Sequence, residues 1–224
     1  MNKIVIYTCI IGGYDDLLQP AVTDPGVDFV CFVGKGEKTA GKVGVWTVRE
    51  LDCELDDRRL KSRYPKMHPH VLLPEYEASL WIDGNIEILD GSIYPILRSK
   101  LESGVKYSGV HHPERDGLYS EAWICRKIGH LSFAEYLKVC VFLLRHGQRP
   151  HGGLFENNLI YRRHNDPQIV RLDELWWSML FKLAWRDQLS FPWCLEQCGI
   201  SFDPLLPGDM NTRNYPGFRY LLHK

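Results

Sequence analysis

One apolar segment that runs into an acidic turn does the most to constrain the fold of this chain. Residues 78–82 read Ala-Ser-Leu-Trp-Ile, which suits a buried strand, and Asp83-Gly84-Asn85 follows directly. In α/β domains, an acidic residue at the end of such a strand lies in the crevice where these folds place their chemistry. Glycine at the next position allows a sharp turn and the close approach of a ligand. The segment predicts an α/β fold with Asp83 at its functional edge.

The same triplet supports two interpretations. Asp83 and Asn85 lie two residues apart, so both could offer oxygens to one hard cation such as Mg²⁺ or Mn²⁺. The triplet also suits a plain turn between two strands, because Asp, Gly and Asn are favoured turn residues. The spacing alone leaves both interpretations open.

The rest of the chain favours the same fold class. Apolar runs without strict alternation indicate strands that are covered on both faces of a sheet. Such runs lie at residues 3–11, 27–33, 44–48, 79–83, 105–110 and 154–162. Helical patterns lie at residues 56–67, 93–103, 119–129, 132–147, 169–185 and 187–198. We expect the first helix to end at Pro65. Alternating strands and helices, followed by a mainly helical half, are typical of an α/β core with helices added late.

Length and composition exclude several classes of protein. The 224 residues fit one globular domain, and the formal net charge of −1 gives no field for nucleic acid. No apolar run approaches the roughly 20 residues of a membrane span, and the first residues do not resemble a signal peptide. The seven cysteines form no C-x-x-C pair, which fits reduced thiols. We therefore expect a cytoplasmic domain without a nucleic-acid partner.

The loop Gly12-Gly13-Tyr14-Asp15-Asp16 follows the first strand. It lacks the spacing of a dinucleotide-binding fingerprint or a P-loop. It could hold a nucleotide, with Tyr14 stacking on the base and Asp15 bonding the ribose hydroxyls. A tight turn without a ligand explains the same residues.

A basic run lies between this loop and the Asp83 strand: Arg58, Arg59, Lys61, Arg63 and Lys66. Arg59, Arg63 and Lys66 have the spacing of one helix face. Guanidinium and ammonium groups on one face suit phosphate oxygens, so we assign Arg63 and Lys66 to cofactor binding. The alternative is a solvated charged face.

A loop crowded with ionisable groups, residues 111–116, follows another strand. Adjacent residues of a strand point opposite ways, so one of the two histidines faces the site at most. We take His112 as a metal ligand or proton donor and Arg115 as a cofactor-binding cation. Glu121 is a candidate catalytic acid, although a carboxylate at a helix start needs no catalytic role.

Asp187 is the last candidate acid. It could begin a helix, or it could bond a sugar hydroxyl. Four tryptophans, at positions 176, 177, 185 and 193, lie in the same region. Indole faces pack on sugar rings, and they also fill protein cores.

Six short motifs in order resemble one known family. They are Ile6-Tyr-Thr-Cys-Ile-Ile-Gly-Gly-Tyr-Asp15, Arg63-Tyr-Pro-Lys66 with Pro69-His70, Trp81-Ile-Asp-Gly84, His112-Pro-x-Arg115, Tyr119-x-Glu121-Ala and Arg186-Asp-Gln-Leu-Ser-Phe191. The order is similar to that of a glycosyltransferase-like family of plant mucilage- and pectin-related proteins and bacterial polysaccharide-biosynthesis relatives. The resemblance covers roughly residues 3–200.

The resemblance implies a GT-A-like (Rossmann-like) fold, with a mixed, mainly parallel sheet flanked by helices. It implies a nucleotide-diphosphate sugar as donor and a divalent metal, Mn²⁺ or Mg²⁺, held by Asp83, Asn85 and a C-terminal histidine. His223 is the candidate, because no other histidine follows His164. Asn85 departs from the family's acid-x-acid pattern. We divide the single domain into a nucleotide-binding half (1–112), a helical acceptor half (113–200) and a tail (201–224).

The function implied is transfer of a sugar to a glycan or glycolipid hydroxyl in surface polysaccharide biosynthesis. Asp187, Glu121 and His112 are the candidate catalytic residues, and peripheral membrane association is possible without a transmembrane segment. One alternative is a carbohydrate-binding protein without catalysis, which the amide of Asn85 favours. Another is a metal-dependent hydrolase with His112 activating water, although the chain has no G-x-S-x-G or H-E-x-x-H motif.

Overall fold

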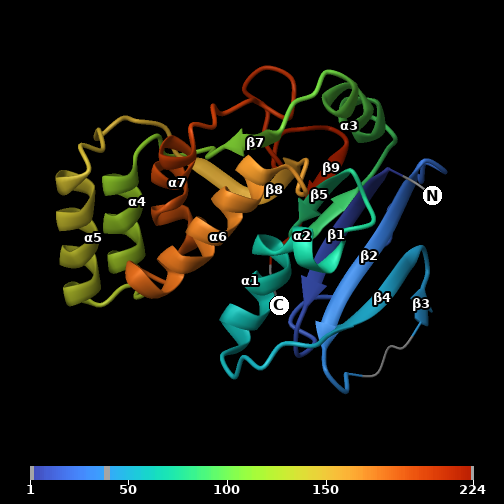
Figure 1. Cartoon of the computed structure of the whole chain (residues 1–224), viewed down its shortest axis with the longest axis horizontal. Coiled ribbons are helices and arrows are strands. Elements are labelled where there is room, and N and C mark those ends of the chain that lie inside the picture. Colours follow the sequence, from blue (N-terminus) through green and yellow to red (C-terminus); the bar gives the residue numbers. More distant parts are fainter. Residues whose placement is uncertain (1–2, 38–40, 223–224) are drawn as a thin grey trace.

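The computed structural model describes residues 3–37 and 41–222, and a mixed sheet forms its centre (Figure 1). The seven strands of this sheet have the order β3-β4-β2-β1-β5-β8-β7. The pairs β1·β2, β1·β5 and β2·β4 are parallel, and the outer pairs are antiparallel. The strands are β1 (Ile4–Ile10), β2 (Val27–Gly34), β3 (Gly41–Val43), β4 (Trp46–Leu51), β5 (Ala78–Ile82), β7 (Tyr107–His111) and β8 (Phe155–Arg162). The predicted mixed sheet, with parallel strands at its centre and helices beside it, is confirmed.

Helices and loops cover both faces of this sheet. They are α1 (Arg58–Met67), α2 (Pro69–Leu72), α3 (Ile93–Glu102), α4 (Leu118–Lys127), α5 (Phe133–Arg145), α6 (Pro167–Lys182), the 3-10 turn η1 (Asp187–Leu189) and α7 (Phe191–Cys198). Val5 and Tyr7 of β1 pack into the core beneath α1 and α6, and Ile4 and Ile6 pack into the core beneath α3. Successive side chains of a strand point to opposite faces, so a strand buried on both faces reads as continuously apolar.

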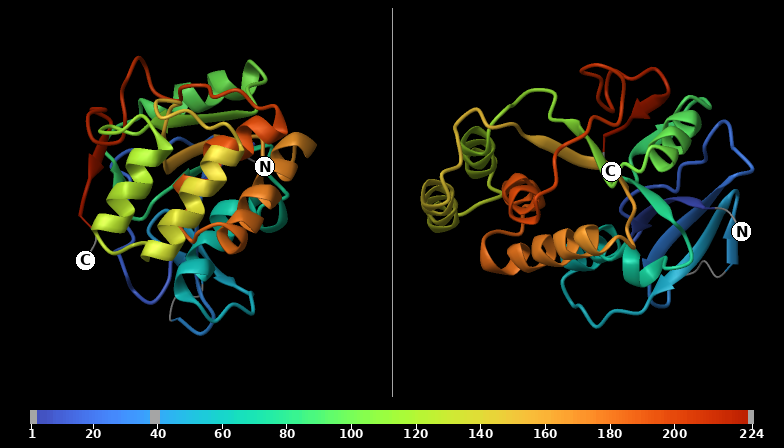
Figure 2. Two further views of the ribbon diagram at one scale, coloured as in Figure 1. Left: turned by 90° about the vertical axis from the view of Figure 1, so that its left-hand side faces the viewer. Right: turned by 45° about the horizontal axis from the view of Figure 1, so that its top comes forward.

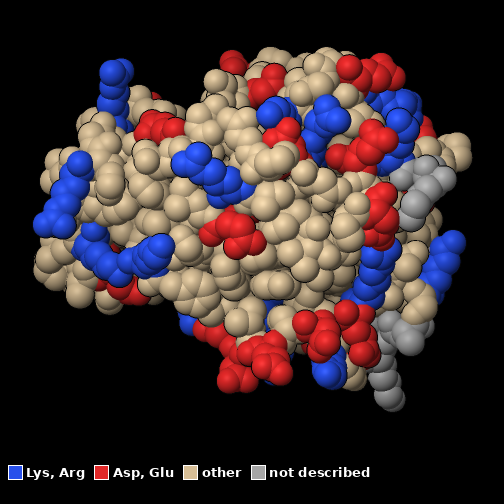
Figure 3. All heavy atoms as spheres, in the orientation of Figure 1, with Lys and Arg blue, Asp and Glu red and all other residues tan. Residues whose placement is uncertain are grey.

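The helical half extends away from the sheet. Helices α4 and α5 form the end of the molecule farthest from β3, and α6 and α7 lie between them and the strands (Figures 1 and 2). Helix α5 begins with a capping box, in which Ser132 and Glu135 satisfy each other's backbone N–H groups. No described helix is long and apolar enough to span a bilayer. Cations and carboxylates are interspersed on the face shown in Figure 3.

Three local predictions were wrong. Helix α1 continues past Pro65 to Met67, which is fully buried, so packing outweighs the hydrogen bond that proline cannot make. Residues 44–48 do not form one strand, because Gly44 turns the chain between the antiparallel strands β3 and β4. The helix predicted at 187–198 is divided at Ser190 into η1 and α7.

The tail returns to the Asp83 turn. Strand β9 (Phe218–Tyr220) pairs with β6 (Ile86–Ile88), the short strand that follows Asn85. The backbone N–H of Leu221 donates to the Asn85 carbonyl over 2.9 Å. Residues far apart in the chain therefore meet where β5 ends.

Candidate active site

Two adjoining cavities lie beyond the carboxyl ends of β1 and β5. We call the larger, of about 620 Å³, the basic cavity, and the smaller, of about 300 Å³, the polar cavity. Four residues line both cavities, and we call them the junction: Arg63, Lys66, Asp83 and Arg186. This edge of the sheet is where α/β folds bind their ligands.

The loop after β1 forms one wall of the basic cavity. Gly12 and Gly13 have φ angles of 69° and 64°, which glycine adopts readily. Their turn places Tyr14 and Asp15 on the cavity, where the Tyr14 side chain is 57% exposed. A Cβ added at Gly84 would lie 3.4 Å from the Asp15 carboxylate, so this glycine lets the two loops pack closely. An exposed aromatic ring beside a cavity is a surface on which a planar ring stacks.

Helix α1 supplies the cations of the basic cavity. Asp57 is the N-cap residue of this helix, and its side chain accepts hydrogen bonds from backbone N–H groups of the first turn. Four basic side chains of α1 line the cavity: Arg58, Arg59, Arg63 and Lys66. The guanidinium carbons of Arg59 and Arg63 lie 5.0 and 5.4 Å from the Trp185 ring centroid, which holds these long side chains in place.

Lys66 and Asp187 form an ion pair at the junction. The Lys66 Nζ lies 3.0 Å from Asp187 Oδ2 and 3.8 Å from Asp83 Oδ1. The Trp81 Nε1–H donates to Asp83 over 2.6 Å, and the Trp176 Nε1–H donates to the Asp187 carbonyl over 2.9 Å. The Trp81 indole thus holds the Asp83 carboxylate, and the Trp176 indole holds the backbone of Asp187.

The pKa of the Asp187 carboxyl reflects this environment. Burial acts to raise the pKa, but the charges of Lys66, Arg63 and Arg186 outweigh burial and hold it well below its usual range. Asp187 is therefore ionised at neutral pH. A carboxylate of such low basicity positions a cation better than it accepts a proton.

A second network lies on one side of the polar cavity. The Arg115 Nε–H donates to Glu121 over 2.7 Å, and an Arg186 nitrogen lies 3.5 Å from the same carboxylate. Burial acts to raise the Glu121 pKa, but Arg115 and the other donors lower it. Burial and the charge of Arg115 lower the pKa of His112 to about 4, so its ring is neutral at neutral pH. His111 is exposed and its ring packs at a tilt against Phe202, and only His112 of the two adjacent histidines lines the cavity.

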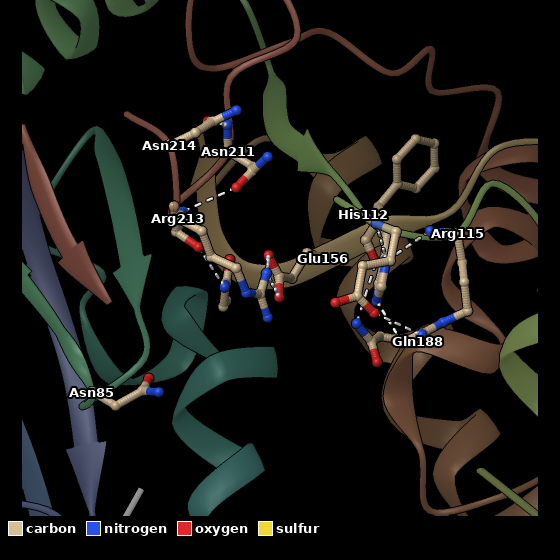
Figure 4. A network of polar contacts seen from close by, with 12 residues as sticks. Asn85, His112, Arg115, Glu156, Gln188, Asn211, Arg213 and Asn214 are labelled. Carbon is tan, nitrogen blue, oxygen red and sulfur yellow. Dashed lines mark hydrogen bonds and ion pairs between the residues drawn. The ribbon is translucent and has the colours of Figure 1, made fainter. Parts of the chain in front are cut away.

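Strand β8 and the tail form the opposite side of the polar cavity. Arg213 donates to Glu156 over 2.7 Å, and Figure 4 shows these two side chains facing each other, apart from the group of His112, Arg115 and Gln188. Burial raises the pKa of Glu156, and Arg213 offsets part of this effect. Asn157 is 3% exposed, and neither end of its amide has a hydrogen-bond partner among the described residues. The Asn157 amide therefore has one donor and one acceptor available to a polar group in the cavity.

The structure brings most of the predicted site residues together. Tyr14, Asp15, Arg63, Lys66, Asp83, His112, Arg115, Glu121 and Asp187 each line at least one of the two cavities. Asn85 lines neither, because its side-chain nitrogen donates to the Leu221 carbonyl over 2.7 Å and ties the tail to the Asp83 turn. His223 lies outside the described residues. Figure 4 shows Asn85 set apart from the polar network.

A divalent metal does not fit the described side chains. Across residues 3–37 and 41–222, no three His, Cys, Asp or Glu side chains are grouped so that they could hold an ion. Asp83 is the predicted ligand that reaches the junction, and the Lys66 ammonium already lies beside it. Hard cations require several oxygen ligands, and a neighbouring fixed positive charge repels them.

Several residues of the polar cavity were not among the predicted site residues: Glu156, Asn157, Asn158, Gln188, Arg213 and Tyr220. Three of them form the run Glu156-Asn157-Asn158, which lies within a strand that is buried at every position. Polar residues in an otherwise apolar strand were the available signal, since buried polar groups need partners. Arg213 gave no signal, because only the folded tail places it opposite Glu156.

A family model described as the TOD1/MUCI70 glycosyltransferase-like domain matches residues 1–203. The chain belongs to this family. The resemblance predicted from the six motifs is confirmed, and all six motifs supply residues of the two cavities beyond the sheet.

One curated protein and two solved structures are similar to this chain at low sequence identity. The probable hexosyltransferase MUCI70 of Arabidopsis thaliana is 23% identical over 211 residues, which cover 84% of this chain and 36% of that protein. The chain thus spans well under half of this curated relative. A solved structure of the galactosyltransferase LgtC with donor and acceptor sugar analogues is 12% identical, covers 89% of this chain and 72% of its own, and has a TM-score of 0.49. Mouse xyloside xylosyltransferase 1 in its apo form is 11% identical, covers 91% and 84%, and has a TM-score of 0.48.

Proposed function

We propose that this domain transfers a sugar from a nucleotide-diphosphate sugar to a hydroxyl of a glycan or glycoconjugate. One observation carries the proposal: a basic, aromatic cavity and a polar cavity meet at Arg63, Lys66, Asp83 and Arg186. A donor of this kind has the same three parts in the same order: a planar base, an anionic diphosphate and a polar sugar. Membership of a glycosyltransferase-like family and the description of a curated relative as a probable hexosyltransferase support it.

The basic cavity accommodates the nucleoside. Its base would stack on Tyr14, and Asp15 would accept hydrogen bonds from the ribose, as predicted from the sequence. The diphosphate would lie at the junction, where guanidinium groups match phosphate oxygens in shape and charge.

The polar cavity accommodates the sugar. Sugar hydroxyls both donate and accept hydrogen bonds, and the unpaired amide of Asn157 offers one group of each kind. Gln188 and Asn158 line the same space. Asp187 and Glu121, each held by cations, would position Lys66, Arg115 and Arg186 around the sugar and the leaving group.

The reaction breaks the bond between the anomeric carbon and the diphosphate oxygen, and the electron pair leaves with the diphosphate. The acceptor oxygen forms the new bond to the anomeric carbon, and its proton passes to a carboxylate. Glu156 suits this proton transfer better than Asp187, because burial raises its pKa while the pKa of Asp187 is held low. The predicted divalent metal enters no step, because the described residues do not fit it. An acceptor in a surface polysaccharide, a cytoplasmic location and peripheral membrane association stay predictions.

Release of nucleoside diphosphate tests the proposal. The purified protein would be incubated with UDP-, GDP- and CDP-sugars and with mixed oligosaccharide acceptors, and the released nucleotide measured. We expect acceptor-stimulated release from one donor class and its loss in Asp83→Ala, with an unchanged far-UV circular dichroism spectrum. Full turnover in that variant contradicts the assignment of Asp83. Saturable glycan binding without nucleotide binding would instead favour the non-catalytic alternative.

A further inference from the structure

We propose that basic side chains at the junction, rather than a divalent metal, neutralise the diphosphate of the donor. This inference rests on the proposed function and deepens it, because it assigns the group that stabilises the leaving diphosphate. Three basic side chains of the junction carry the proposal, Arg63, Lys66 and Arg186, and Arg58 lies beside them in the basic cavity.

The first observation is that basic side chains outnumber carboxylates in the basic cavity. Arg58, Arg59, Arg63, Lys66 and Arg186 line it, against the two carboxylates of Asp15 and Asp83. Sites built for a divalent cation have the opposite balance, with carboxylates in excess. A cavity with an excess of cations attracts a diphosphate without an intervening metal.

The hydrogen-bond donors of these cations are the second observation. Neither Arg58 nor Arg63 forms an ion pair with a described carboxylate. The Nε atoms of Arg63 and Arg186 are buried and have no hydrogen-bond partner within the described chain. Both Nε–H groups belong to side chains that line the junction, so they are available to donate to a phosphate oxygen.

The third observation is that the Lys66 ammonium lies beside Asp83, where the predicted metal would bind. The Lys66 ammonium is fixed 3.0 Å from Asp187 and 3.8 Å from Asp83, and its side chain is only 8% exposed. It therefore already supplies positive charge beside the acid that the family pattern uses for metal. The second position of that pattern, Asn85, donates to the Leu221 carbonyl and faces neither cavity. The ammonium group takes the electrostatic role of the ion.

Calorimetric titration with and without metal tests this inference. UDP, GDP, CDP and inorganic pyrophosphate are the probes, each added to the full chain in EDTA and again in excess Mn²⁺. We expect at least one nucleotide to bind in EDTA with a Kd within about threefold of its value in Mn²⁺. We also expect the affinity to fall with added salt, since it depends on charge.

Arg63→Gln is the informative variant, and Arg145→Gln is its matched control. Arg63 makes no described ion pair, so its replacement leaves no buried carboxylate unpaired; Arg145 is exposed at the end of α5, away from both cavities. Loss of a charge-assisted contact predicts at least about tenfold weaker nucleotide binding in EDTA for Arg63→Gln and no change for Arg145→Gln. Equal thermal unfolding midpoints would show that both variants are folded.

The outcomes separate this inference from the proposed function. Binding that requires Mn²⁺ and is lost in Asp83→Ala or His223→Ala overturns the inference and leaves the proposed function standing. Binding in EDTA that Arg63→Gln does not weaken overturns the assignment of the basic side chains. If no nucleotide binds in either condition, both the inference and the proposed function are wrong.

Discussion

Two buried ion pairs in this domain differ in what surrounds them. Arg162 and Asp173 pair inside the core, where their side chains are 1% and 0% exposed, and they line neither cavity. Lys66 and Asp187 pair at the wall of the polar cavity, where both side chains are 8% exposed. The two acids respond oppositely. Burial raises the pKa of Asp173 to about 7 despite Arg162, whereas the cations around Asp187 hold its pKa low.

The two ion pairs have different roles, because different numbers of cations surround the two acids. One cation does not compensate an acid for complete burial, but the three around Asp187 more than compensate it. The core pair is thus a local structural contact, and Arg162 also donates to the Lys66 carbonyl, which fixes the end of α1. At the junction, Arg63 forms no described ion pair, and this is the charge that an anionic ligand would use first.

Breaking the core pair should have the largest effect on stability. Arg162→Met leaves Asp173 buried without its partner, so we expect the free energy of unfolding to fall by about 3–5 kcal/mol. Urea denaturation followed by circular dichroism measures this loss. The double variant Arg162→Met/Asp173→Leu should recover most of it, since an apolar pair replaces both charges. A double variant as unstable as the single one would show that the packing of Arg162, rather than its charge, matters.

Breaking the junction pair should affect binding more than stability. In Lys66→Met, the charges of Arg63 and Arg186 still face Asp187, so we expect a loss of only about 1–3 kcal/mol in the free energy of unfolding. Nucleotide binding should weaken by more than about tenfold, because a phosphate contact is lost. Calorimetry and denaturation of the same preparation check the two effects together. Loss of stability without loss of affinity would make Lys66 a structural residue like Arg162.

The pH dependence of stability should separate the two acids. The folded pKa of Asp173, about 7, lies above the unfolded value of about 3.9. Between these values the folded state binds more protons, so Asp173 lowers stability as pH rises, by at most about 1.4 kcal/mol per pH unit. Asp173→Asn should remove this slope. The folded pKa of Asp187 lies below its unfolded value, so its contribution is constant above pH of about 4 and is lost only below it.

Denaturation at several pH values between about 4.5 and 7 measures these slopes. Asp173→Asn and Asp187→Asn are matched changes, since each removes one carboxylate of a buried pair. We expect a changed slope in the first variant and the wild-type slope in the second. Equal slopes in all three proteins would remove the distinction between the two pairs.

The sequence predicted the elements better than the contacts between them. The buried strand β1 is apparent because its alternate residues face two separate cores and both sets are mainly apolar. Asp83 and Lys66 were found because an acid after a buried strand and a basic helix face have local patterns. The pairing of Lys66 with Asp187 joins residues 121 positions apart, and no local pattern specifies such a contact.

The tail shows the same limit more clearly. Residues 202–224 read as a tail wrapped over the domain, but nothing in them specified that β9 pairs with β6 or that Arg213 reaches Glu156 in the polar cavity. Asn85 was assigned to metal on its spacing from Asp83, but spacing does not reveal which way a side chain points. The amide of Asn85 faces the tail, because the returning strand offers it the Leu221 carbonyl.

Asn85 provides the smallest of these tests, because its role resembles that of the core pair rather than that of the junction. Its side chain is buried and makes one hydrogen bond, to the Leu221 carbonyl. Asn85→Ala should therefore lower the free energy of unfolding by about 1 kcal/mol, the usual value of one such bond. Nucleotide affinity should remain within about twofold of wild type, since Asn85 lines neither cavity. A loss of affinity comparable to that of Asp83→Ala, at unchanged stability, would instead make Asn85 a ligand-binding residue and place it with the junction.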